Sequence, residues 1–209
     1  MTNYSECIKA RRSVRTYEKR IVDEALREQL LAFGQTIKNP YNLPVEFRFM
    51  EAGEHGLSCP VVCGTDLYVA GKIKAGGDAC VAFGYTFETF VLYAWSLGLG
   101  TVWLGGTMNR PAYEAAMELG DDEMMPCASP LGYPAKKMSV KETVMRKAIK
   151  ADERLPFGEL FFDGDFTVPL TAENAGNLAF PLEMVRLAPS ALNKQPWRVV
   201  KAGLWYIFT

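Results

Sequence analysis

The chain has 209 residues, of which 49% are hydrophobic and 22% charged, and its formal net charge is −1. This length allows one large domain or two small fused halves, with a sizeable buried core. The near-neutral charge argues against nucleic acid or an anionic membrane as the main partner, because both normally require a large basic excess.

The five cysteines indicate reduced thiols in a cytoplasmic protein. Their number is odd, the chain is not small, and its first residues, Met1 to Glu6, are polar and unlike a signal peptide. His55, Cys59 and Cys63, with Asp66 nearby, could suggest a metal site, but the paired C-x2-C spacing is absent. We therefore expect loop thiols and no metal.

Capping residues and periodicity predict the first elements in chain order. Ser5 can cap a short helix, and Asp23 can cap the next one. Partial alternation predicts a strand over Val45 to Glu51 and another over Leu67 to Gly71. The longest predicted helix runs from Asp78 to Leu97, where aromatic and apolar residues recur at helical spacing.

The segment Thr89 to Asn109 carries no charged residue and approaches the length of a membrane-spanning helix. Glycines and hydroxyl residues interrupt it, and no Lys/Arg cluster flanks it. We interpret it as the end of a buried helix, a glycine turn and a buried strand over Thr101 to Leu104, in a protein without membrane contact.

The remaining elements alternate in type. Asn109 starts a helix, Met125 to Leu131 is predicted as a strand, and Pro134 to Arg154 as a solvated connection. A helix within Thr171 to Leu187 precedes two strands over Trp197 to Thr209. Such alternation predicts an α/β or α+β domain.

Three stretches could carry chemistry. In the arginine segment, Arg11 to Arg15, guanidinium groups can grip phosphate oxygens in pairs, although a basic, solvated helix end would look similar. In the proline–serine loop, Ala188 to Trp197, small residues beside two amides can lie against a flat heteroaromatic ring, or form an ordinary turn. In the glycine stretch, Gly98 to Gly106, paired glycines allow a ligand to approach the backbone, or simply make a tight turn.

Together, these stretches resemble the nitroreductase family of FMN-dependent enzymes in order and separation. The proline–serine loop is close to the family's A-P-S-x-x-N-x-Q-P-W loop and is the most specific match. Leu131 to Pro134 resembles a strand end of the family, and Arg154 to Pro156 its late basic segment. The resemblance covers most of the chain and implies an α+β fold with an antiparallel-rich central sheet flanked by helices.

The position of the proline–serine loop near the C-terminus resembles a branch in which two family halves are fused in one chain. This implies an internal pseudo-duplication, with residues 1–150 as the first half and 151–209 as the second half that completes the flavin site. A weak sequence similarity between Phe47–Gly53 and Trp197–Gly203 agrees with this duplication. The second half would be expected to continue beyond Thr209, and the protein would be a monomer with fused halves or a homodimer.

The resemblance also implies a role for individual residues around FMN. Three arginines would hold the phosphate: Arg11, Arg12 and Arg154. Ser13 and Arg15 would reach the ribityl chain and the pyrimidine edge, and backbone N–H groups near the reactive nitrogen would come from Leu104, Gly105 and Gly106. The ring would be bordered by Pro189, Ser190, Ala191, Asn193 and Gln195. No catalytic side chain is expected, because the flavin carries the hydride chemistry.

The implied activity is the reduction of a small aromatic or conjugated acceptor, with NADH or NADPH as donor. The alternative is a non-catalytic flavin-binding protein or redox sensor, which would keep the same residues without turnover.

Overall fold

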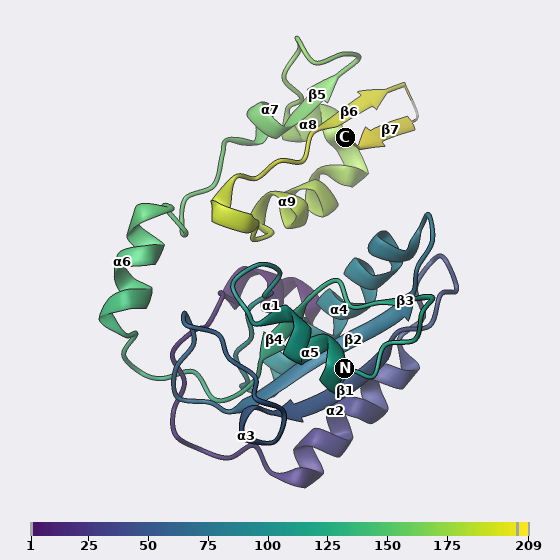
Figure 1. Cartoon of the computed structure of the whole chain (residues 1–209). Helices are drawn as coiled ribbons and strands as arrows, with labels where there is room; N and C mark the ends of the chain where they lie inside the picture. The colour runs from purple at the N-terminus through teal and green to yellow at the C-terminus, as the bar shows by residue number, and fades with distance from the viewer. Residues whose placement is uncertain (1, 204, 209) are drawn as a thin grey trace. The chain divides into compact units, whose positions relative to one another are not determined.

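Figure 1 shows the computed structural model of the chain, which describes residues 2–203 and 205–208. The chain divides into two compact units. Unit 1 contains the residues up to Cys7 and Arg11–Glu142, and unit 2 contains Ile8–Ala10 and the residues from Thr143 onward. Each unit has its own hydrophobic core. That they represent two halves of one ancestral family fold stays a prediction.

The sheet of unit 1 is antiparallel throughout, which confirms the predicted sheet type. Its strands are β1 (Glu46–Glu51), β2 (Leu67–Lys74), β3 (Glu123–Met124) and β4 (Ala128–Pro130). β2 lies between β1 and β3 and also pairs with β4. With its helices, unit 1 therefore has the expected α+β content.

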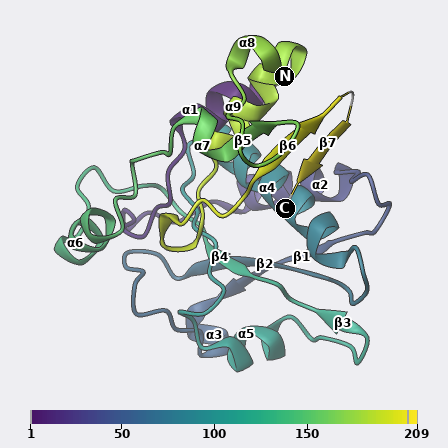
Figure 2. The ribbon, with the colours of Figure 1, turned by 90° about the horizontal axis from the view of Figure 1, so that it is seen from above.

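Helices cover both faces of this sheet. Figure 2 shows α2 (Glu24–Thr36) and α4 (Ala79–Ser96) on one face, and α3 (Ala52–His55) and α5 (Arg110–Ala116) on the other. The alternation of β2 explains this arrangement: Leu67 and Val69 pack with residues of α2 and α4, whereas Tyr68 and Ala70 pack with residues of α5. Both faces of the central strand are thus buried.

The two predicted N-caps have different outcomes. The Asp23 side chain accepts a hydrogen bond from the Leu26 amide at 2.9 Å and caps α2 as predicted. The first helix, α1 (Tyr4–Ala10), is capped by Asn3 and not by Ser5, because the Asn3 side chain accepts from the Glu6 amide.

Two other predictions were wrong. Thr101 to Leu104 forms isolated bridges in place of a strand, because the Val102 amide donates to the Ser129 hydroxyl at 3.0 Å and not to a backbone carbonyl. The expected solvated connection from Pro134 to Arg154 contains a helix, α6 (Val140–Ala148). This helix buries Glu142 and Arg146, so its charges do not mark a fully solvated segment.

Unit 2 builds a smaller mixed sheet. β5 (Phe161–Asp163) pairs in parallel with β6 (Val199–Ala202), which pairs antiparallel with β7 (Trp205–Phe208). Besides most of α6, its helices include α7 (Phe157–Leu160), α8 (Ala172–Ala175), α9 (Ala179–Leu187) and the short 3-10 turns η1 (Gly176–Leu178) and η2 (Ala191–Asn193). The predicted end of the last strand, Thr209, lies outside the described residues.

In the part of the chain that the structure describes, no helix is long and apolar enough to cross a membrane. The same residues contain no group of three or more His, Cys, Asp and Glu side chains that could hold a metal ion. Cys63 is exposed, whereas Cys59 is buried beside Thr107.

Gly64 should be essential for the close approach of its backbone to Tyr17, two residues beyond the arginine segment. Its φ is +91°, and a Cβ atom there would lie 2.1 Å from the Tyr17 carbonyl oxygen. Gly64→Ala should lower the free energy of unfolding of unit 1 by roughly 2–4 kcal/mol, measured in urea. Gly76→Ala, where a Cβ would meet open space, is the control. Equal stability of the two variants would show that this backbone contact is dispensable.

Candidate functional site

The arginine segment is fixed in unit 1 through its backbone. The Val14 amide donates to the Thr101 carbonyl at 2.9 Å, and the Val14 side chain is fully buried. A Cβ atom on Gly100 would lie 2.8 Å from Val14 Cβ, so a glycine is needed where the two segments cross. This packing places the arginine segment beside the glycine stretch.

Arg11, at the C-terminal end of α1, has a buried guanidinium group. Its side chain is only 3% exposed, and its Nη1 lies 3.0 Å from Glu88 Oε1. Among the residues that the structure describes, Arg11 Nε and Nη2 are buried without a hydrogen-bond partner. Unpaired buried donors on a cation are costly, and an anion would satisfy them.

Glu88 of α4 is a site residue that the sequence analysis missed. Its second oxygen, Oε2, accepts a hydrogen bond from Trp103 Nε1 at 3.0 Å. Burial raises the pKa of Glu88, while Arg11 and Trp103 act in the opposite direction. The signal was visible in the sequence, since Glu88 is the single charged residue of α4. One carboxylate in an apolar helix indicates a buried partner.

Arg12 is held by another carboxylate, Glu142, which is buried. Its Nη1 lies 3.4 Å from Glu142 Oε1, and the Glu142 side chain is 1% exposed. Thr16 Oγ1 donates to the other Glu142 oxygen at 2.6 Å. Each of the first two arginines of the segment is therefore tied to one carboxylate.

The end of the glycine stretch is anchored on both sides. The Leu104 amide donates to the Ala128 carbonyl at 2.7 Å, so this N–H group is engaged in the fold and does not suit the ligand contact expected for it. Arg110 Nη2 donates to the Gly105 carbonyl at 2.8 Å, and Arg110 Nη1 to the Met125 carbonyl at 2.8 Å. Gly105 and Gly106 are exposed and remain the candidates for contact through the backbone.

The proline–serine loop of unit 2 has an unusual backbone. Leu192, Asn193 and Gln195 have φ values of 53°, 54° and 46°, in the left-handed region. Each such residue costs about 1 kcal/mol relative to ordinary conformations, so the surroundings must hold the loop in place. Within it, the Gln195 amide donates to Ser190 Oγ at 2.8 Å.

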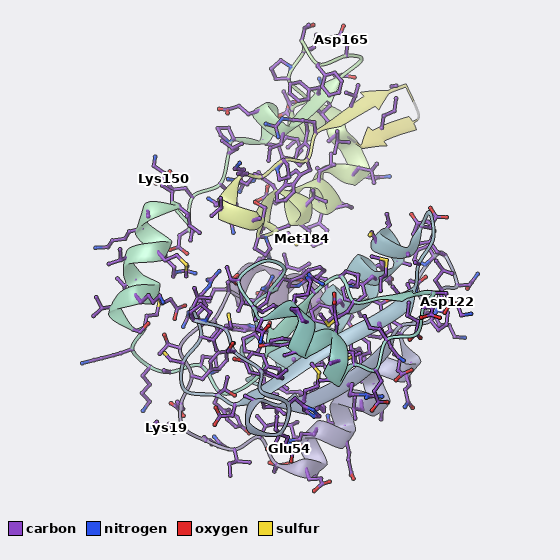
Figure 3. All side chains as sticks on the ribbon, viewed as in Figure 1. Lys19, Glu54, Asp122, Lys150, Asp165 and Met184 are labelled. Carbon is purple, nitrogen blue, oxygen red and sulfur yellow. The ribbon has the colours of Figure 1, made fainter. Side chains whose placement is uncertain are left out.

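Two amide side chains tie this loop to the backbone that follows α6. Asn193 Nδ2 donates to the carbonyls of Lys150 at 2.7 Å and Glu153 at 3.0 Å. The Gln195 side chain, which is buried, accepts from the Leu155 amide at 2.9 Å. Lys150, labelled in Figure 3, marks where this segment begins.

Arg154 is bonded within the same network. Its Nη1 lies within 3.3 Å of three acceptors, namely Asn193 Oδ1 and the carbonyls of Ala151 and Glu153. Its Nε donates to the Leu187 carbonyl at 3.2 Å. A pocket of about 250 Å³ is lined by these groups and their neighbours: Ile149, Lys150, Glu153, Arg154, Leu155, Asn193 and Gln195.

The structure thus gathers the predicted residues into two sets. Unit 1 carries Arg11, Arg12, Ser13, Arg15, Leu104, Gly105 and Gly106, and unit 2 carries Arg154, Pro189, Ser190, Ala191, Asn193 and Gln195. Within unit 1, Glu88 links Arg11 of the arginine segment to Trp103, the residue before Leu104. Within unit 2, Arg154 and the proline–serine loop are bonded to each other directly.

Residues 3–204 match the sequence model of a family described as "Putative TM nitroreductase". Among solved structures, a "putative nitroreductase" from Thermotoga maritima has a TM-score of 0.64 at 22% identity, over 99% of this chain and 75% of its own. No functionally curated protein gives a match.

Two further solved structures are similar over a smaller share of this chain. A nitroreductase with bound FMN from Bacteroides fragilis has a TM-score of 0.52 at 21% identity, over 67% of this chain and 92% of its own. A mutant of an FMN and NADPH-dependent nitroreductase from Sphigopyxis sp. strain HMH has a TM-score of 0.54 at 16% identity, over 66% and 91%. At these identities the structures show a shared fold, and the family match over nearly the whole length shows that the chain belongs to this nitroreductase family.

Proposed function

We propose that this chain is an FMN-dependent oxidoreductase that reduces a small aromatic or conjugated acceptor with NADH or NADPH as donor. Membership of the family supports the oxidoreductase class. The structurally similar proteins that bind FMN or depend on FMN and NADPH support the choice of cofactor and donor.

The single observation that carries the FMN proposal is the guanidinium of Arg11. It is buried, its Nη1 is taken by Glu88, and its Nε and Nη2 lack partners among the described residues. Two neighbouring N–H groups on one edge of a guanidinium fit two oxygens of a phosphate monoester. Arg12 adds a second cation beside it in the segment. The residues present therefore fit the phosphate end of FMN.

The other residues take the roles that the family resemblance gives them. Ser13 and Arg15 would contact the ribityl chain and the pyrimidine edge, and the backbone of Gly105 and Gly106 would face the ring. Residues of the proline–serine loop would border the ring: Pro189, Ser190, Ala191, Asn193 and Gln195. Bound FMN supplies hydride transfer, and the chain supplies binding, orientation and electrostatics.

Arg11→Met should weaken FMN binding while sparing much of the binding of riboflavin, which has no phosphate. Each lost charge-assisted hydrogen bond costs about 1.5–3 kcal/mol, so FMN affinity should fall roughly 10- to 150-fold. The bond from Trp103 Nε1 to Glu88 does not involve Arg11, so it should keep Glu88 in place in this variant. The measurement is calorimetric titration of apo-protein with both flavins.

Lys19→Met is the matched control, because Lys19 is exposed (Figure 3) and lies just beyond the arginine segment. Its flavin affinities should equal those of the wild type. If Arg11→Met weakens FMN and riboflavin equally, Arg11 does not bind the phosphate.

Arg15→Ala should lower the reduction potential of bound FMN. Reduction adds negative charge at the pyrimidine edge, and a fixed cation in a site shielded from water stabilises that charge. The expected shift is roughly 20–60 mV, since 30 mV corresponds to about 1.4 kcal/mol for two electrons. The reduction potential of Arg15→Lys should lie between those of the wild type and Arg15→Ala, because lysine keeps the charge and lacks the planar guanidinium.

Potentiometric titration and stopped-flow reduction by NADH and NADPH measure this. A wild-type protein that binds FMN but is reduced by neither donor would favour a flavin-binding protein or redox sensor. If Arg15→Ala keeps the wild-type reduction potential, Arg15 does not tune the flavin, and the proposal that the protein is an enzyme is unaffected.

The fused-half proposal predicts one FMN per chain in a monomer. Light scattering during size exclusion, combined with absorbance in the flavin band, gives mass and stoichiometry together. Flavin found only in the dimer fraction would contradict this proposal and support a homodimer of the usual family kind.

A further inference from the structure

We propose that Arg154 is a positioning residue that holds the proline–serine loop in its strained backbone conformation, and that flavin-ring binding depends on it. This inference rests on the proposed function for its flavin readout only. It differs from the phosphate contact that the family resemblance implies for Arg154, because it assigns the guanidinium to the protein's own carbonyl groups.

The first argument is the direction of the Arg154 bonds. Its Nε donates to Leu187, the last residue of α9, and its Nη1 reaches Asn193 Oδ1 inside the loop. The same Nη1 reaches the carbonyls of Ala151 and Glu153, on the segment that carries Arg154 itself. One side chain therefore connects the end of α9 and the middle of the loop to the segment after α6.

The second argument is the backbone that these bonds hold. Leu192, Asn193 and Gln195 are all in the left-handed region, which non-glycine residues leave readily when they are not constrained. Asparagine tolerates this region, whereas leucine and glutamine do not favour it. Since three such residues stand within four positions, the loop needs contacts from outside itself to keep its shape.

The third argument is that the amides of the loop are occupied by protein groups. Asn193 uses Nδ2 for two carbonyls and Oδ1 for Arg154. Gln195 uses Oε1 for the Leu155 amide, and its Nε2 lies 3.4–3.5 Å from the carbonyls of Asn193 and Glu153. These groups are engaged in unit 2 and shape the loop, so a ring beside the loop would meet a surface that Arg154, Asn193 and Gln195 have set.

A phosphate ligand and a loop-positioning residue give opposite results with riboflavin. Loss of a phosphate contact weakens FMN and spares riboflavin. Loss of the loop's shape weakens both flavins by the same factor, because both carry the same ring. Arg154→Met keeps the length of the stem and removes all the donors, so it separates the two roles.

We expect Arg154→Met to reduce the affinities for FMN and riboflavin by a common factor of about 10 or more, with their ratio unchanged. Amide exchange of the apo-protein in residues 188–196 should accelerate by a similar factor, since the Asn193 and Gln195 amides lose protection. Lys194→Met, which removes an exposed cation from the same loop, should change neither.

Asn193→Leu provides a second route if Arg154→Met folds poorly. It removes the oxygen that faces Arg154 and both donors to the carbonyls without adding a charge, so exchange should again accelerate and both affinities should fall together. FMN weakened alone in either variant would overturn the proposal in favour of a phosphate contact. Unchanged amide exchange in both variants would overturn it as well. This measurement needs no flavin, so it tests the proposal even if the wild type binds none. A wild type that binds no flavin would reject the proposed function and not the role of Arg154.

Discussion

A buried guanidinium is costly unless its N–H groups find partners, and in unit 1 Glu88 is the partner of Arg11 Nη1. Glu88 accepts from Arg11 with one oxygen and from the Trp103 indole with the other. Helix α4, the arginine segment and Trp103 are thereby held in one arrangement. Glu88 leaves Arg11 Nε and Nη2 without a partner among the described residues, and in the proposed function these two donors bind the phosphate.

Unit 2 meets a related constraint on its backbone. The segment after α6 turns sharply, with Lys150 at a φ of 49°, and its carbonyls point to groups of the proline–serine loop. Asn193 and Arg154 supply the donors for these carbonyls, and Gln195 supplies an acceptor for the Leu155 amide. Residues that resemble ligand contacts in the sequence therefore also stabilise the fold. Their side chains form the hydrogen bonds that the backbone groups of the strained loop and of the segment after α6 require.

Local signals in the sequence were sufficient for elements whose partners are near in the chain. The Asp23 cap and the long helix α4 follow from capping and from apolar spacing, and both are present. The sequence could not show that Glu88 meets Arg11, because 77 positions separate them. The sequence also led to a wrong prediction for α6. Its many charged residues indicated a solvent-exposed connection, but Glu142 and Arg146 are buried. A charged side chain can be predicted to be exposed only when the fold offers it no partner of opposite charge.

The groups that hold a cofactor determine the acceptor only weakly. Contacts to a phosphate are equal before and during hydride transfer, so they increase binding without favouring one acceptor over another. Selectivity must come from side chains that meet the acceptor at the ring. In unit 1, Trp103 lies two residues before Gly105 and is 38% exposed, and its indole N–H donates to Glu88. For the aromatic or conjugated acceptor proposed above, Trp103 would offer a flat surface, and the carboxylate that orients its indole also pairs with Arg11.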